Sequence, residues 1–347
     1  MVWKIFKEPL FLMGILTIFF MLTVSIFYSL FTEPPQPLKS ILVYNENGQL
    51  IGKHPLPPSE EYLLGTDSQG VSMVYKIIQG AKYTIGFAII VALLRMILSL
   101  LASIAFSTSL RKLRPTLKSF SDSFTYAPSA LVVYIILSPV VVIYSWAFTG
   151  PEKVLLTFTC LTLIALPTLT FIISEEVTEI GKHEFITSAR SLGSSRVQIL
   201  WRHVVPFLLP RLFILFAQQI VQVLLLFAHL GILGLFIGGT NLIVEDSSLE
   251  MGNQPEMISS SLSYEWAGLI AAARDVINIY PWMIYPPVIA LTLTILAMIF
   301  IVEGLKSAFL DKKPFTIKRR AVNQTKDQGD PINHESFEFL NDNQKIM

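Results

Sequence analysis

Cysteine and charge are both scarce in this sequence. Its 347 residues include one cysteine, Cys160, and only 15% of them are Asp, Glu, Lys or Arg. A lone cysteine excludes a disulfide framework and a cysteine-based metal cluster. Because 52% of the residues are hydrophobic, the shortage of charge excludes an ordinary soluble enzyme and indicates a protein that crosses a membrane several times.

Motifs of catalysis are missing as well. His183-Glu184 is followed by Thr187 at the position where a zinc-protease helix needs a second histidine. Gly65 and Gly70 have the spacing of a phosphate loop, but no Lys-Ser or Lys-Thr follows Gly70. The histidines show no metal-ligand spacing. We therefore expect a chain that is not an enzyme, binds no metal or cofactor and cannot hydrolyse ATP by itself.

Long apolar runs predict an all-α polytopic membrane protein with six transmembrane helices, because each run is long enough to cross a bilayer. The runs lie at about 9–31, 84–110, 124–148, 154–174, 204–238 and 281–302. The first run is too long for a signal-peptide core and is not followed by a small-residue cleavage site. We therefore interpret residues 1–31 as a short cytoplasmic N-terminus with a retained first helix.

The distribution of charge predicts the orientation. If Met1 is cytoplasmic, most lysines and arginines fall in cytoplasmic segments, as the positive-inside rule requires. Both termini are then cytoplasmic, and two long polar segments, residues 32–83 and 240–279, lie outside. The first contains a predicted hairpin around Asn47-Gly48, and the second is acidic. Three carboxylates, Glu175, Glu176 and Glu179, are predicted to form a solvated end of the fourth helix.

A polar insert at residues 175–203 separates the fourth and fifth apolar runs. Phe185, Ala189 and Leu192 recur at helical spacing, so we expect them to share one apolar face. Gly193 favours a break between two short helices, and Pro206 marks the entry to the next span. A rigid helix pair between two spans indicates a docking element for a cytoplasmic partner. The alternative is an ordinary surface helix.

Two motifs resemble those of a known family. Thr187-Ser188-Ala189, Gly193 and His203-Val204-Val205-Pro206 keep the spacing of the cytoplasmic "EAA" loop of ABC-importer permeases, although Thr187 stands where that family usually has Glu. Leu64-Gly65-Thr66-Asp67, followed by Gly70 and then Gly80-Ala81, is similar to a segment of the C-type permease subunit of dipeptide, oligopeptide and nickel importers.

The resemblance implies a type I ABC importer fold. Its permease domain would cover residues 80–304, five core helices with the coupling loop at 175–203, preceded by one N-terminal helix and an extracytoplasmic segment at 32–79 and followed by a cytoplasmic tail at 305–347. The residues implied to contact the ATPase are Glu184, Thr187, Ser188, Ala189, Arg190, Gly193, His203 and Pro206.

The resemblance also implies partners, a substrate and a location. The chain would work in the plasma membrane with cytoplasmic ABC ATPase subunits that use ATP, a second B-type permease and an extracytoplasmic substrate-binding protein, without any nucleic acid. Its cargo would be peptides or nickel complexes. Two rival functions are an ion-coupled secondary transporter, which needs carboxylates inside the membrane, and a membrane assembly protein without a transport role.

Three polar residues within the spans are candidates for a translocation path, namely Arg95, Gln218 and Gln222. A charge at mid-bilayer usually faces protein or a water-filled path. Arg95 could therefore contact a substrate carboxylate, or it could bond to neighbouring carbonyls. Gln218 and Gln222, with Gln219 beside them, share one helix face and could line the path or bond between helices.

Overall fold

The structure, a computed structural model, describes residues 2–33, 42–44, 50–107, 110–245 and 256–310. Five helices are long and apolar enough to cross a membrane, and a bent pair of shorter helices raises the number to six. The long helices are α2 (Pro9–Phe31), α3 (Met73–Ser107), α6 (Gly150–Ile180), α9 (Val205–Ile232) and α11 (Tyr285–Leu310). The expected all-α fold with six spans is thus confirmed.

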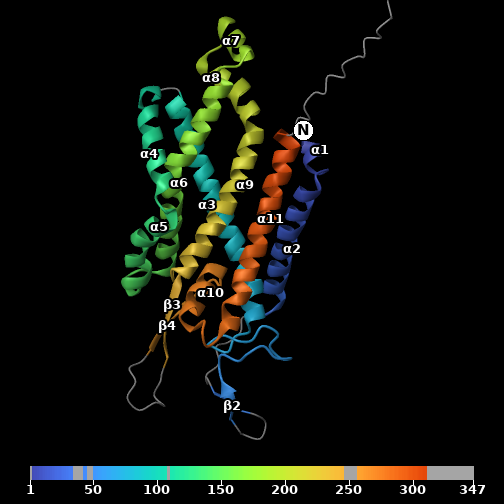
Figure 1. Cartoon of the computed structure of the whole chain (residues 1–347), viewed down its shortest axis with the longest axis vertical. Coiled ribbons are helices and arrows are strands. Elements are labelled where there is room, and N and C mark those ends of the chain that lie inside the picture. Colours follow the sequence, from blue (N-terminus) through green and yellow to red (C-terminus); the bar gives the residue numbers. More distant parts are fainter. Residues whose placement is uncertain (1, 34–41, 45–49, 108–109, 246–255, 311–347) are drawn as a thin grey trace, which may run out of the picture. The chain divides into compact units, whose positions relative to one another are not determined.

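The long helices α2, α3, α6, α9 and α11 run side by side (Figure 1). Helix α3 packs against α2, α6 and α9, and α11 packs against α2 and α9. The short helices α7 (Glu184–Ser191) and α8 (Arg196–Ile199) lie at the same end of this bundle as α1 (Val2–Ile5), whereas the strands lie at the opposite end (Figure 1). The predicted topology likewise places the N-terminus and the insert at 175–203 on one side of the membrane and the two long polar segments on the other.

The third span, predicted at about 124–148, is broken into two helices and starts earlier, at Arg114. The structure has α4 (Arg114–Tyr126) and α5 (Ser129–Ser138), bent by 83° at Ala127-Pro128. Ala127 is extended, with φ −81° and ψ 128°, because a following proline disfavours helical backbone. A π-helical turn, Pro139–Ile143, continues α5 after a second proline.

The second span begins earlier than residue 84, because α3 starts at Met73. Two lysines in its first turns made this stretch look like a loop, but both have partners. The Lys76 ammonium pairs with the Asp67 carboxylate and is buried, and Lys82 Nζ donates to Ser29 Oγ on α2 at 2.5 Å. These polar partners allow α3 to include both lysines at the end of the helix bundle.

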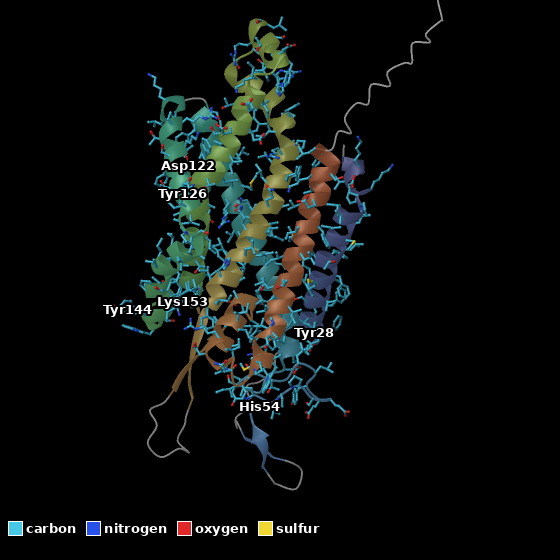
Figure 2. The ribbon with its side chains drawn as sticks, viewed as in Figure 1. Tyr28, His54, Asp122, Tyr126, Tyr144 and Lys153 are labelled. Carbon is cyan, nitrogen blue, oxygen red and sulfur yellow. The ribbon has the colours of Figure 1, made fainter. Side chains whose placement is uncertain are left out.

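The bundle end opposite α7 carries two hairpins. The predicted one is confirmed, since β1 (Leu42–Tyr44) pairs antiparallel with β2 (Leu50–Lys53). The second, β3 (Thr240–Glu245) with β4 (Glu256–Ser261), belongs to the segment predicted as a polar acidic loop. His54, labelled in Figure 2, also lies at this end.

The prediction of a polar loop at 240–279 was wrong for its second half. Residues Trp266–Ala273 form helix α10, whose residues are nearly all buried. The Trp266 amide donates to Thr84 Oγ1 at 3.0 Å, and its indole Nε1 donates to the Ile77 carbonyl at 3.0 Å. Eight residues are too few to cross a bilayer, so a prediction based on the length of apolar runs does not identify α10.

Glycine allows α9 and α10 to approach closely. A Cβ atom added to Gly231 would lie 2.7 Å from the Ala267 carbonyl oxygen. The fifth span ends at Ile232, earlier than the expected residue 238, because the chain then turns through Gly234 and Gly239, with φ of +85° and +90°. Glu265, before α10, closes this turn by accepting hydrogen bonds from the Ile237 and Gly238 amides, each at 3.0 Å.

Candidate functional site

The polar insert folds as the two short helices predicted from its sequence. Helix α6 ends at Ile180, α7 spans Glu184–Ser191 and α8 spans Arg196–Ile199. Gly193 lies between them with φ +86°, a conformation that glycine adopts without strain. A π-helical turn, Leu200–Val204, then leads into α9, where Pro206 occupies the first turn. We call residues 181–204 the docking loop.

The apolar face of α7 differs from the predicted one. Ile186 and Ala189 are buried, whereas the side chains of Phe185 and Leu192 are 42% and 87% exposed. Of the predicted apolar face of Phe185, Ala189 and Leu192, only Ala189 is buried. Ile186 and Ala189 belong to an apolar cluster that also contains Ile180 and Val204 at the ends of the adjoining helices.

The outward side of the docking loop combines exposed apolar and polar residues. Trp201 is 64% exposed and Leu192 is 87% exposed. The predicted contact residues are divided, because Ala189 is buried and His203 is half-buried. The others, Glu184, Thr187, Ser188, Arg190, Gly193 and Pro206, are exposed at this end of the bundle. Large exposed apolar side chains rimmed by polar ones are typical of a protein interaction surface.

Aromatic rings brace the docking loop at its root. The ring of His183 stacks on that of Phe185, with centroids 5.6 Å apart and planes at 16°. Both rings contact Phe207 on α9, at 5.4 and 5.8 Å. His203 completes the group at 6.5 Å from Phe185. These contacts join the loop entrance to the loop exit, so the loop is a stiff element.

The carboxylates at the end of α6 are paired, although they were predicted to be a solvated helix end. Glu175 accepts a hydrogen bond from Arg114 of α4 at 2.8 Å, and Glu176 lies 2.9 Å from Arg211 of α9. Glu179 pairs with Lys182 within the same turn at 2.6 Å. Sequence reasoning missed the first two pairs because their arginines come from other helices.

Arg95 is buried inside the bundle and bridges three helices. Its Nε and Nη2 atoms donate to the Leu161 carbonyl of α6, at 2.9 and 2.6 Å. Its Nη1 donates to Gln219 Oε1 of α9 at 3.3 Å, and Gln219 Nε2 donates in turn to Gln222 Oε1 at 3.1 Å. Of the two interpretations of Arg95, the structure therefore contains the bond to a neighbouring carbonyl.

The same arginine also lines a cavity of about 380 Å³. Polar groups on its wall include Arg95, Gln219, Gln222 and Ser129, and the rest of the wall is largely apolar. Gln218 does not belong to this lining, and the residue beside it, Gln219, is the buried partner of Arg95. The helical spacing of Gln218 and Gln222 identified the right stretch of α9 but only one of its two polar contacts.

The chemical capacity of these sites is binding. Among the described residues, no three His, Cys, Asp or Glu side chains are placed to hold a metal ion. The cavity offers a cation and amides, which can hold carboxylates and peptide-like carbonyls. The docking loop exposes large apolar side chains at one end of the bundle. A cavity between membrane helices together with a rigid loop outside them is an arrangement suited to transport.

Comparisons with known proteins agree with this arrangement. The sequence profile of the family described as "binding-protein-dependent transport system inner membrane component" matches residues 96–313. The peptide transport system permease protein SapC of Salmonella typhimurium is 25% identical over 276 residues, which are 78% of this chain and 82% of that protein.

Two further relatives have the same character. SapC of Escherichia coli O6:H1 is 26% identical over 274 residues, 77% of this chain and 81% of that protein. A putative peptide permease protein of Brucella abortus is 25% identical over 256 residues, 73% of this chain and 74% of that protein. The matched region of the family profile contains the docking loop and the glutamines of α9.

Proposed function

Because this chain belongs to the family of binding-protein-dependent transport system inner membrane components, we propose that it is a permease subunit of an ATP-driven ABC importer of peptides. The family and the long apolar helices identify a multi-pass inner membrane protein with the type I ABC importer membrane fold. The names of the relatives support peptides as cargo rather than nickel complexes, which the sequence alone left open.

The docking loop carries the proposal. It is braced by ring contacts, seated on buried Ile186 and Ala189, and turned outward with exposed Leu192 and Trp201. A surface of this kind fits the cleft of a cytoplasmic ABC ATPase subunit. The residues proposed for this contact remain those predicted from the sequence, with Ala189 supporting the loop from its buried side and Gly193 setting the angle between α7 and α8. They are Glu184, Thr187, Ser188, Ala189, Arg190, Gly193, His203 and Pro206.

The proposed mechanism is alternating access. ATP brings two ATPase subunits together, and their movement draws the docking loops of this chain and of a second B-type permease toward each other. The cavity beside Arg95 then opens toward an extracytoplasmic substrate-binding protein. This chain contributes the loop and part of the path, including Arg95, Gln219 and Gln222, and the ATPase subunits hydrolyse the ATP.

The two rival functions have less support. An ion-coupled transporter needs carboxylates within the membrane, and helices α2, α3 and α9 contain no Asp or Glu. A membrane assembly protein without a transport role gives no reason for a braced loop at one end of a helix bundle that also holds a cavity lined by Arg95. We therefore favour the importer over both rival functions.

Affinity purification followed by transport in vesicles tests the proposal. A tagged chain, purified from its own host in mild detergent, should bring with it an ABC ATPase and a second permease. Vesicles holding this complex should accumulate labelled trialanine only with ATP and the binding protein. Accumulation driven by an ion gradient without an ATPase would support the secondary transporter, and a complex without any transport would support the assembly protein.

A further inference from the structure

We propose that the ion pair between Arg114 and Glu175 is a positioning link that makes the broken span α4–α5 move with the docking loop. The inference rests on the proposed function, because it concerns how movement of the loop reaches the cavity. Arg114 and Glu175 lie outside both the docking loop and the cavity, and the proposed link transmits movement from one to the other.

The pair joins two helices at the root of the loop. Arg114 is the first residue of α4, and its Nη2 lies 2.8 Å from Glu175 Oε1, near the end of α6. The Arg114 side chain is only 19% exposed, and its Nη2 also lies 3.4 Å from the Ser174 carbonyl oxygen. The Glu175 side chain is 56% exposed, so the position of the pair is fixed mainly on the Arg114 side, where one guanidinium contacts both a carboxylate and a carbonyl.

The docking loop follows α6 through apolar packing. Ile186 and Ala189 of α7, Ile199 of α8 and Val204 pack in one cluster with Val177 and Ile180 of α6. The Glu176–Arg211 ion pair adds an electrostatic contact between α6 and α9, the two helices that flank the loop. Loop and helix ends therefore form one stiff unit, and a force on the loop displaces the end of α6 that carries Glu175.

Helix α4 buries few apolar side chains. Among its described side chains, Leu117 is the only buried apolar one, whereas Lys118, Phe120 and Asp122 face outward. Figure 2 shows Asp122 and Tyr126 on this helix at one side of the bundle. Helix α4 packs along α6, and the Arg114 contact ties its first residue to the part of α6 that carries Glu175.

Movement of α4 changes the cavity. Phe124 near the end of α4 and Ser129 at the start of α5 both line the cavity that contains Arg95. The bend at Ala127-Pro128 lies between them. A contiguous series of contacts thus runs from the docking loop through Glu175 and Arg114 to the cavity wall, and such a series can be tested as a coupling between two sites.

Pulsed electron resonance on the assembled transporter tests the link without knowledge of the cargo. Spin labels at Lys118→Cys on α4 and Lys182→Cys at the loop entrance, in a Cys160→Ser background, report how the two elements move. Both positions are exposed. In the otherwise unchanged complex we expect one narrow distance distribution, both without nucleotide and with ATP plus vanadate, because α4 and the loop move together.

Arg114→Glu should uncouple the two elements. The ratio of labelled pairs at the original distance to all other pairs should fall at least about fivefold in the ATP–vanadate state, the lower end of usual couplings between sites. The exchanged pair Arg114→Glu with Glu175→Arg should restore the narrow distribution. If the Arg114→Glu complex does not assemble, Glu175→Gln replaces it in the test. This variant keeps the size of the side chain and should give the same loss of the original distance.

The control is another ion pair near the same end of the bundle. Glu303 and Lys306 of α11 pair at 2.7 Å within one helix and connect no second element, so reversing both charges should change nothing. A narrow distribution in Arg114→Glu with ATP and vanadate would overturn the link, as would an exchanged pair that does not restore it. Absence of any ATPase from the purified unchanged complex would reject the proposed function as well, so the two failures differ.

Discussion

At the scale of single residues, Arg95 unites the features that the sequence left as alternatives. It bonds to the Leu161 carbonyl and to Gln219, and it also lines a cavity. A charge at mid-bilayer costs about 2.5–3.5 kcal/mol on insertion scales, and hydrogen bonds to a buried cation each return roughly 1.5–3 kcal/mol. The hydrogen bonds explain how the buried charge of Arg95 is tolerated, and the cavity is the space in which Arg95 would contact a substrate.

We predict that Arg95→Lys lowers peptide uptake about tenfold, or about 1.4 kcal/mol, while the complex still assembles and retains its basal ATPase activity. Lysine keeps the charge but loses the planar fork that reaches Leu161 and Gln219 together. Arg95→Gln keeps a donor for the Leu161 carbonyl but loses the charge, so uptake by this variant should also be lower than uptake by the unchanged chain. Uptake at the original rate in both variants would reject a path role, and loss of the complex in both would favour a structural role.

A second residue-scale prediction concerns the effect of pH on the strand end of the bundle. Burial lowers the pKa of His54, which the carboxylate of Asp67 partly offsets, and the His54 ring lies 2.8 Å from Thr66 Oγ1. A buried neutral histidine takes up its proton more readily after unfolding, so its contribution to stability is complete above the unfolded pKa of about 6.5 and declines as pH falls below it.

Hydrogen exchange can measure this effect. We expect the amides of residues 65–71 to exchange faster at pH 5.5 than at pH 7.5, after correction for intrinsic rates. His54→Gln should abolish the difference, whereas His183→Gln, an exposed histidine of the docking loop, should leave it unchanged. Equal protection of these amides at both pH values in the unchanged chain would contradict the assignment.

At the scale of elements, the docking loop depends on the conformation of one glycine. Gly193 has φ +86°, and an added Cβ would meet nothing within 4 Å, so only the backbone resists substitution. Gly193→Val should cost about 1–2 kcal/mol in this region of φ and shift α7 against α8. The chain should remain in the membrane, but ATP hydrolysis should become uncoupled from uptake. Gly193→Asn is the matched control, because asparagine tolerates positive φ, and equal coupling in both variants would refute this role.

Sequence patterns predicted the elements whose determinants are local. The break at Gly193 and the entry of the fifth span at Pro206 follow from residue types within one turn of the chain. The bend at Pro128 could have been read from the same kind of signal. In contrast, the buried face of α7 depends on where Ile180 and Val204 lie, and the burial of α10 depends on Thr84 and Gly231 from distant helices. Those contacts have no signature in a single sequence.

At the scale of the whole molecule, the topology predicts which loops face the cell exterior. The docking loop and α1 share one end of the bundle, and the strands occupy the other (Figure 1). In a Cys160→Ser background, Leu63→Cys should react with a membrane-impermeant maleimide in intact cells, because this side chain is 74% exposed at the strand end. Ser194→Cys should react only after the cells are opened. The reverse pattern would invert the orientation.

The central claim is that the docking loop seats an ABC ATPase, and photo-crosslinking from Leu192 tests it most directly. This side chain is 87% exposed on the loop, so a photoreactive amino acid there should attach to the ATPase subunit in living cells and be identified by mass spectrometry. The same amino acid at Leu63 is the control and should not reach the ATPase. A crosslink to an ATPase from Leu192 alone is the predicted result, and a Leu192 probe that captures only lipid or a secreted protein would contradict the account.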